Sequence, residues 1–508
     1  MSVLSAEVAV SAWRVRVDAC SHLVLEAFHP QVEELTWQMP GGADTAQVRL
    51  DGALADQDDL RRWLGAEMSL APAGGAPCWW GYLHGVEVQR GGVRWRWDLA
   101  QVVNRCAVRY RAPTPWSGEG GAGPFQTPWA EDGRSQRRFG VRECIFSVGE
   151  ASEAEAFARR DTLLAERAFP RLQILPPLSG SDGLVLLEGR GWWHILGWRY
   201  ASHPQGWLGS AHREGTSLTW GHASAVQQVA QAFTPDGDGW DCGEVWVWLI
   251  RAGSPVDDVE ISLCADAGAQ PGTALMTFTL SGSSLSRDPA LGWVRLRPSS
   301  TLRLNSTTRY WLVLRRTGAL DAQNAYLTRV DADDSLGTPP GLMAFNGSVW
   351  QSLGSGSLLA NLFGEEVLTD HLVRLAGQDG AGQRLRGVFV RQPSMKRVRL
   401  YRDGRRTALD VCRDLLAMDD LDAYITAERY LMVERRTAPP PVLNLTLDAN
   451  GGLRLPDGSP WGLSMPPVGR WASLRLSAGL SVPVRLERVK WRDGSLRVEG
   501  FSVWWGKS

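Results

Sequence analysis

The stretch WWGYLHGVEVQRGGVRWRWDL, Trp79 to Leu99, places four tryptophans close together and interleaves the last two with arginines. It is either an exposed aromatic strip that grips a sugar or a nucleic-acid strand, or a β-hairpin with one face in a core. The register favours the hairpin, because apolar and charged residues alternate as they do in a half-buried strand. Gly91-Gly92 sits where a two-residue turn needs positive φ. The apolar positions are Val93, Trp95, Trp97 and Leu99.

The length and composition of the chain limit the classes of protein to which it can belong. A chain of 508 residues is too long for one hydrophobic core, so we expect three or four domains. Charged residues make up 21% and hydrophobic residues 44%, which argues against wholesale disorder. The 54 basic and 55 acidic residues give a net charge of −1, which argues against a generally basic nucleic-acid binder or membrane-surface protein. The 25 tryptophans suit thin β-sandwiches, small barrels and interfaces.

The seven cysteines are scattered and contain no C-x-x-C, so we expect free, mostly buried thiols. The N-terminus lacks the basic start and apolar core of a signal peptide, and no apolar run is long enough for a membrane-spanning segment. We therefore expect a chain that is made in a cytoplasm and stays soluble there until it is assembled.

Most of the chain reads as short alternating strands joined by Gly, Asp-Gly and Asn-Gly turns, as in SAWRVRVDA and TAQVRLDG. We expect a mainly β chain: several small antiparallel barrels or sandwiches with two short helices. The helices open at capping boxes, Ser152 with Glu155 and Thr407 with Asp410. Near the C-terminus the apolar register shifts at 486–489 and again at 498–501, which predicts either paired β-bulges or a sharp bend.

Changes in amino-acid composition along the chain predict four domains. From about residue 224 to 364 charged residues become less frequent, and Ser, Thr and Gly become more frequent around the strands. This change indicates an inserted β-sandwich of jelly-roll type. The domains are a β-barrel module (1–112), a helix-containing module (113–220), the jelly-roll insert (221–366) and a C-terminal module that completes the scaffold (367–508).

Catalytic motifs are absent from the sequence: there is no metalloprotease, nucleophile-elbow, P-loop or Rossmann pattern. The carboxylate pairs are adjacent in sequence, which does not place two carboxylates across one sugar. We therefore predict no enzyme and no cofactor. Asp236, Asp238 and Asp241 share a Gly-rich loop, either a plain turn or a Ca²⁺ site.

A basic run extends from Arg384 to Arg406 and contains one acid, Asp403. It is either a solvated outer face or, alternatively, a subunit contact or a wall near DNA. The candidate subunit-interface residues are Arg397, Arg399, Arg402 and Arg405.

Three short elements resemble the minor tail and tail-hub proteins of tailed bacteriophages. Asn104, Arg105, Val108 and Tyr110 match the family's "N-R-V-x-V-x-Y" strand, although Cys106 stands at a usually apolar site. Phe139, Gly140 and Glu143 match its "Y/F-G-x-x-E", and Ala168, Pro170 and Arg171 match the "A-x-P-R" that ends its alanine-rich helix. The segment from Arg405 to Arg436 is also similar to the family, so the resemblance lies on both sides of the insert.

The resemblance implies a structural protein of the virion, in the tail tip or baseplate hub. It implies a ring-forming homo-oligomer, a trimer, that joins the tail tube to the tip or fibres and is assembled in the host cytoplasm. The expected partners are other copies of the chain and other tail proteins, with no specific nucleic acid.

The insert resembles jelly-roll domains that look like carbohydrate-binding modules, so a host-surface glycan is a further expected partner. The candidate sugar-stacking residues are Trp240, Trp246, Trp248, Trp293 and Trp350. Trp246 and Trp248 alternate with Val245 and Val247, so only one of these two pairs can face the core. Two alternatives stay open: a polysaccharide-active enzyme that carries a binding module, and a soluble glycan-binding adhesin.

Overall fold

The computed structural model forms two compact units: unit 1 contains 1–201, 372–394 and 405–508, and unit 2 contains 202–371 and 395–404. The described residues are 5–10, 13–18, 29–51, 61–111, 125–179, 183–201, 207–209, 215–223, 225–235, 239–331, 337–354, 356–380, 384–399, 406–436, 443–447, 452–455, 457, 459, 469, 471–475, 481–492 and 495–503. Among them, no helix has the length and hydropathy to cross a membrane. The described cysteines are free, as expected: Cys78, Cys106, Cys144, Cys242, Cys264 and Cys412.

Unit 1 is built around a 14-stranded sheet. Its main path is β1 (Ser5–Val10), β2 (Trp13–Asp18), β5 (Glu67–Pro72), β6 (Trp79–Arg90), β13 (Leu184–Gly191), β4 (Gly42–Asp51), β3 (His29–Gln38), β35 (Ser481–Arg492), β34 (Trp471–Arg475), β32 (Leu443–Leu447) and β33 (Leu453–Arg454). Beside this path, β7 (Val93–Asp98) pairs with β6 and with β12 (Gln173–Leu175), and β36 (Ser495–Val503) pairs with β35. The prediction of a mainly β chain is confirmed.

The hairpin predicted from Trp79 to Leu99 is present as β6 and β7. Gly91 and Gly92 join the two strands with φ of 57° and 73°, the positive values that a type I′ turn requires. β6 is buried along nearly its whole length, because it pairs with β5 at its start, with β7 at its end and with β13 from Gly81 to Gln89.

The core covers only the base of this hairpin. Trp97 is buried, Trp95 is half-buried, and Val93, next to the turn, is 46% exposed. The prediction that Val93 lies in the core is wrong. β7 is flanked on its outer side by the three-residue β12, so the tip of the hairpin extends past the side chains that would cover it.

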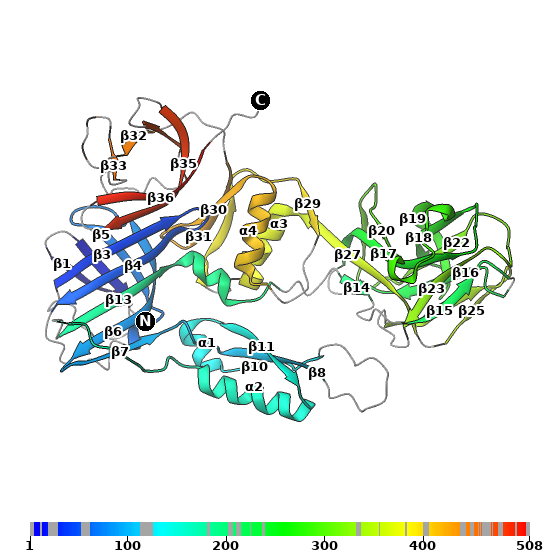
Figure 1. The fold of residues 1–508 in the computed structure, drawn as a ribbon, viewed down its shortest axis with the longest axis horizontal. Helices are drawn as coiled ribbons and strands as arrows, with labels where there is room; N and C mark the ends of the chain where they lie inside the picture. Colours follow the sequence, from blue (N-terminus) through cyan, green and yellow to red (C-terminus); the bar gives the residue numbers. More distant parts are fainter. Residues whose placement is uncertain are drawn as a thin grey trace. The chain divides into compact units, whose positions relative to one another are not determined.

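Strands from the two ends of the chain meet in the large sheet. β3 pairs antiparallel with β35, from Glu34 opposite Arg492 to Gln38 opposite Arg488. Figure 1 draws these strands in blue and red within unit 1. The register of β35 against β36 shifts around Arg488, which confirms the predicted bulge there. Segments on both sides of unit 2 in the sequence thus build one sheet.

Two smaller sheets complete unit 1. One contains β10 (Ala130–Glu131), β8 (Arg105–Arg111), β11 (Glu143–Glu150) and β9 (Phe125–Gln126), and the other contains β28 (Gly387–Val390), β31 (Tyr430–Arg435) and β30 (Leu421–Ile425). Both predicted helices are present, α2 (Glu153–Arg167) and α4 (Ala408–Met418), each with its predicted capping box. The structure adds α1 (Gly133–Phe139), α3 (Leu368–Arg374) and the short helices η3 (Trp192–Trp198) and η6 (Leu375–Gly380).

Unit 2 is a sandwich of two sheets. The larger sheet has the main path β14 (Trp207–Gly209), β27 (Ala360–Val367), β17 (Trp240–Ala252), β23 (Ala325–Asp331) and β15 (Thr216–Trp220), joined by β20 (Trp293–Leu296), β21 (Leu302–Leu304), β26 (Ser357–Leu358) and β29 (Arg397–Arg399). The smaller sheet runs β19 (Pro271–Ser281), β18 (Asp258–Asp266), β22 (Tyr310–Arg316), β16 (Gln228–Phe233), β24 (Gly337–Phe345) and β25 (Trp350–Ser352). Short helices η4 (Gly282–Ser284) and η5 (Pro289–Leu291) precede β20.

The core of the sandwich lies between its two sheets. Val245 and Val247 of β17 pack in one apolar cluster with Ile261 and Leu263 of β18. Alternation in both strands places these branched side chains on the inner faces. The valine pair of β17 therefore faces the core.

Candidate functional site

The residues that carry the phage-tail resemblance meet in unit 1. Asn104, just before β8, is fully buried, and its side-chain amide joins three segments. Its Nδ2 donates to the Gly140 carbonyl at 2.8 Å and to Ser135 Oγ at 3.1 Å, and its Oδ1 accepts from the Arg142 backbone N–H at 2.7 Å. Ser135 Oγ in turn donates to the Ala168 carbonyl. Asn104 thus fixes α1, the start of β11 and the end of α2 against β8.

Glu143, at the start of β11, forms a second buried contact point. Its Oε1 accepts from Arg105 Nη1 at 2.7 Å and from Arg199 Nε at 3.3 Å, and its Oε2 accepts from the Tyr200 backbone N–H at 2.8 Å. Two guanidinium groups and an amide therefore compensate one buried carboxylate. These contacts have a structural role, and the surfaces that could bind a ligand or a partner lie elsewhere in the chain.

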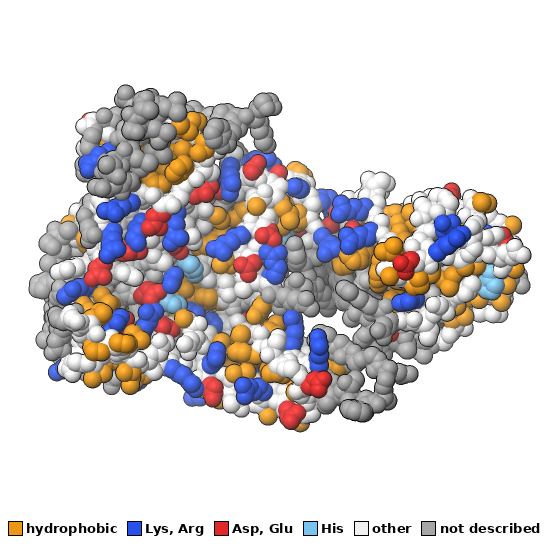
Figure 2. Space-filling view, in the orientation of Figure 1, with side chains coloured by type: hydrophobic (Ala, Val, Ile, Leu, Met, Phe, Trp, Pro, Cys, Tyr) orange, Lys and Arg blue, Asp and Glu red, His pale blue; other side chains and the backbone are white. Residues whose placement is uncertain are grey.

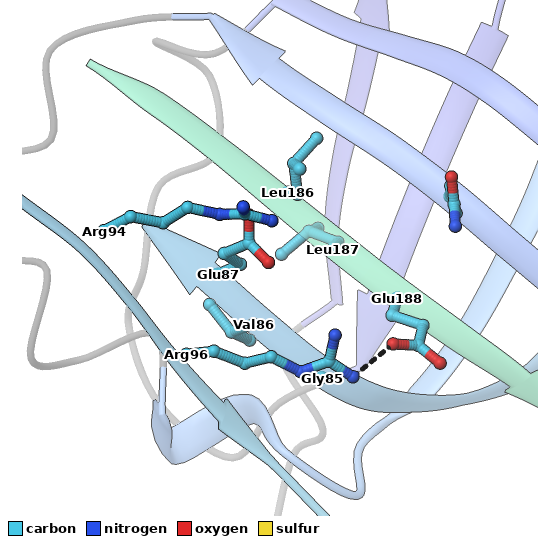
Figure 3. A pocket seen from close by; sticks show the side chains of 9 residues that line it. Gly85, Val86, Glu87, Arg94, Arg96, Leu186, Leu187 and Glu188 are labelled. Atoms are coloured by element: carbon cyan, nitrogen blue, oxygen red, sulfur yellow. Dashed lines mark hydrogen bonds and ion pairs between the residues drawn. The ribbon is translucent and has the colours of Figure 1, made fainter. Parts of the chain in front are cut away.

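A pocket of about 250 Å³ lies in unit 1 beside β6, β7 and β13 (Figure 3). Arg94 and Arg96 extend into it from β7. Arg94 pairs with Glu87 of β6, and Arg96 pairs with Glu188 of β13 at 2.6 Å and with Asp98 at 2.9 Å. The arginines that alternate with the tryptophans of the opening stretch are therefore engaged by carboxylates, two of them on neighbouring strands.

The charged groups that line this pocket pair with one another. Glu87 and Asp98 are buried, and a buried carboxylate is costly unless a cation compensates it. Glycoside cleavage needs two carboxyl groups, one of which carries a proton to the leaving oxygen. Glu87 and Glu188 instead each bind a guanidinium group, which favours a role in holding β6, β7 and β13 together.

The second candidate surface is the outer face of the larger sheet of unit 2. β17 changes register against β27 between Cys242 and Glu244, so Gly243 occupies a β-bulge. A Cβ on Gly243 would lie 2.6 Å from Glu365 Cβ, which explains the glycine. The bulge shifts the alternation by one residue, and Cys242 and Val245 both face the core.

The predicted sugar-stacking tryptophans therefore separate. Trp240 precedes the bulge and is buried in the core of the sandwich. Trp248 follows it on the outer face but is buried in a second apolar cluster. Trp350 is half-buried on the smaller sheet. Trp246 and Trp293 are half-buried on the outer face of the larger sheet and meet edge to face, with ring centroids 6.4 Å apart.

Arginine side chains lie over the aromatic rings of this outer face. The Arg295 guanidinium is 4.1 Å from the centroid of a Trp246 ring, and that of Arg399 is 4.5 Å from the Phe363 ring. Sequence reasoning missed Arg295. The signal was the alternation Trp293–Arg297, WVRLR, which repeats the tryptophan–arginine pattern of the opening stretch.

Carboxylates lie among these arginines. Arg397 binds Asp241 and Glu365, both at 2.6 Å, and Arg399 binds Glu244 at 3.2 Å. Arg397 and Arg399 are two of the residues predicted at a subunit interface. Within unit 2 they attach β29 to β17 and β27.

Some predicted site residues lie outside the described part of the chain: Asp236, Asp238, Arg402 and Arg405. Asp241, the third residue of the candidate Ca²⁺ loop, binds Arg303 at 3.5 Å as well as Arg397. Within the described residues, no three His, Cys, Asp or Glu side chains are grouped so that they could hold a metal ion.

A third surface lies at the edge of the large sheet of unit 1. Ile174 of β12 stands opposite Trp95 of β7 and is 76% exposed. Leu172, two residues before it, and Val93 are also exposed. We call these four side chains the edge row. In the described residues β12 has β7 as its strand partner on one side and no strand on the other.

Comparison with known proteins leaves the family open. No family model matches the sequence, and no curated protein does. Among solved structures, the 43 kDa tail protein of prophage MuSo2 from Shewanella oneidensis is 10% identical with a TM-score of 0.18, over 55% of this chain and 96% of that one. Prophage tail protein gp18 from Listeria monocytogenes EGD-e is 10% identical with a TM-score of 0.18, over 54% and 94%. The insecticidal delta-endotoxin Cry8Ea1 from Bacillus thuringiensis is 6% identical with a TM-score of 0.17, over 59% and 52%. Similarity this weak identifies neither a family nor a function.

Proposed function

We propose that this chain is a structural component of a bacteriophage tail tip or baseplate, a hub-like ring protein that joins the tail tube to the tip or fibres. The motif residues Asn104, Gly140 and Glu143 support this role, because they interlock β8, α1 and β11 as a structural framework. The pairing of β3 with β35 supports it too, since it makes one scaffold sheet from both ends of the chain. The protein then acts in the virion tail after assembly in the host cytoplasm.

The observation that carries the proposal is the edge row of unit 1. An exposed apolar row beside an open strand edge is a template for pairing with another chain. We assign it to a second copy of this chain, with contacts of the same kind repeated around an axis to close a ring of three. Each large apolar side chain that becomes fully buried contributes about 1.5–3 kcal/mol. The edge row is then the anchor of a larger interface, which must exceed roughly 1,000 Å² to be stable.

Light scattering after size exclusion, with the chain at micromolar concentration, tests this assignment. We expect the wild type to elute with the mass of a trimer and Ile174→Lys to elute as a monomer, because the lysine would bury a charge in the contact. Val256→Lys is the matched control, since Val256 of unit 2 is 95% exposed and outside the edge row. A monomeric wild type, or an Ile174→Lys variant that assembles normally, would overturn the assignment.

Unit 2 is an accessory domain of this ring and binds a glycan on the outer face of its larger sheet. Trp246 and Trp293 support this role, because they are half-buried on that face and outside the core. Loss of glycan binding by the full chain on replacing Trp293 with Ala, with unchanged oligomeric mass, is the expected result.

The polysaccharide-active enzyme remains the alternative, because the pocket of unit 1 holds two carboxylates, Glu87 and Glu188. Their ion pairs with arginine make a structural role the better account. Release of reducing ends from a polysaccharide, abolished by Glu188→Gln in a folded variant, would favour the enzyme.

A further inference from the structure

The outer face of the larger sheet of unit 2 presents guanidinium groups where a sugar-stacking site would present bare rings. Arg295 lies over Trp246 and Arg399 over Phe363, both within cation–π distance. A neutral sugar that stacked on these ring faces would have to displace the arginines. A ligand that approaches this face therefore meets the guanidinium groups before it reaches the aromatic rings.

Positive charge exceeds negative charge on the described part of this face. We call it the arginine face, and its arginines include Arg295, Arg297, Arg303, Arg397 and Arg399; Arg329 also lies on this face, over the Trp248 ring. Three carboxylates lie among them, Asp241, Glu244 and Glu365, and each is bound by at least one arginine. Figure 2 shows basic side chains gathered on unit 2 where Figure 1 draws β20, β27 and β29. The chain's own acids thus do not neutralise the face.

Two arginines, Arg295 of β20 and Arg297 just after the end of this strand, are available to a ligand. Arg295 makes its contact with the Trp246 ring, and in the described residues no carboxylate binds it. A cation–π contact of this kind uses none of the guanidinium N–H donors as an ion pair would, so they can still bind an anionic group. The side chain of Arg297 is 83% exposed and meets Glu244 at a long 3.4 Å, while Arg399 binds the same carboxylate at 3.2 Å.

The ligand that this surface fits carries carboxylates. The arginines already bind three carboxylates of the chain itself, so the geometry suits that group. Trp293 and Arg295 stand on the outer side of β20, roughly 7 Å apart as alternate residues of a strand do, and Arg297 follows directly after Leu296, whose side chain is in the core. The three side chains offer a ligand one ring and two cations.

We propose that unit 2 binds an acidic polysaccharide, a chain of sugars bearing carboxylate groups, along β20. Arg295 and Arg297 bind carboxylates and Trp293 packs against a sugar ring. This inference rests on the proposed glycan-binding role of unit 2 and adds the charge of the ligand.

Binding of the full chain to immobilised polygalacturonate, at about 0.15 M salt, tests the inference. The matched probe is fully methyl-esterified polygalacturonate, which keeps the sugars and removes the charge. We expect the esterified polymer to bind at least about tenfold more weakly, and R295Q/R297Q to lose about tenfold on polygalacturonate, since each exposed charge contact contributes a factor of a few. Arg315→Gln is the control, because this exposed arginine pairs with Glu260 on the smaller sheet, and we expect it to bind as the wild type does.

Several results would overturn the inference. These are no binding to polygalacturonate, equal binding to the esterified polymer, or equal binding by R295Q/R297Q when circular dichroism shows it folded. Equally tight binding to poly-L-glutamate or to single-stranded DNA would also overturn it, because the face would then attract any polyanion. Light scattering on the same samples separates the two proposals: a wild type that binds polygalacturonate as a monomer refutes the ring and leaves the glycan site standing.

Discussion

Asn104→Leu should destabilise unit 1 while leaving unit 2 intact. Leucine has the same number and branching of side-chain heavy atoms as asparagine, so the substitution removes hydrogen bonds without opening a cavity. It leaves the Gly140 carbonyl and the Arg142 backbone N–H without the side-chain partner that each has now, at 2.8 and 2.7 Å. Ser135 Oγ loses one contact but keeps the Ala168 carbonyl as an acceptor.

The expected loss follows from the desolvation of these groups. A buried polar group left unsatisfied costs about 1–3 kcal/mol, and here two backbone groups are affected. We take about 3 kcal/mol as the loss in the free energy of unfolding of unit 1. In a unit of this size that lowers the midpoint of thermal unfolding by roughly 4–5 °C.

Differential scanning calorimetry of the full chain is the assay, because the two units should give separable transitions. The transition of unit 1 should fall and that of unit 2 should stay. Gln126→Ala is the control: it removes an exposed amide of β9, in the same sheet as β8, that accepts from Arg109 at 3.1 Å. Its effect should remain within about 0.5 kcal/mol. A loss below about 1 kcal/mol for Asn104→Leu, or an equal fall in both transitions, would refute the structural role of Asn104.

Two further predictions concern one residue of each unit. Burial, with the positive charge of Arg142 and other arginines, lowers the pKa of His84 from 6.5 to about 3. As the pH falls, His84 therefore takes up a proton in the unfolded state before it does so in the folded state. The free energy of unfolding of unit 1 decreases as the pH drops below about 6.5, by about 2 kcal/mol at pH 5. Urea unfolding at pH 7.5 and pH 5 should show this loss in the wild type and a smaller one in His84→Phe; equal losses would contradict it. Gly243→Ala should destabilise unit 2 by about 1–3 kcal/mol in calorimetry, because its Cβ would lie 2.6 Å from Glu365 Cβ. Gly149→Ala, whose Cβ meets no atom within 4 Å, should change neither transition.

Local features of the fold follow from the sequence alone. The turn at Gly91-Gly92, the capping boxes at Ser152 and Thr407, and the bulge around Arg488 all appear as predicted. Each depends on residues that are near one another in the chain: two glycines that accept positive φ, a side chain that reaches a backbone N–H three residues away, or a break in a period of two. Such signals need no knowledge of the neighbouring strands.

The candidate site was predicted only in part, because it depends on which strands pack against one another. The alternation around Trp246 identifies two faces of a strand, but the sequence does not say which face a second sheet will cover. The bulge at Gly243 then decides that Trp240 enters the core and Trp246 does not. Sequence reasoning therefore named Trp246 among its candidates and missed Arg295, the arginine that covers its ring.

Tertiary structure alone decided which strands and charges meet. The pairing of β3 with β35 joins segments about as far apart as the chain allows, and no local pattern encodes it. The same alternation that places Trp97 in the core leaves Val93 exposed, because burial depends on how far the neighbouring strands extend. The alternation in the sequence places Arg96 on the outer face of its strand. In the structure Arg96 binds Glu188, a residue that the sheet brings beside it. Periodicity and turn chemistry are short-range and can be read from sequence, whereas burial and ion pairing depend on residues that only the folded chain brings into contact.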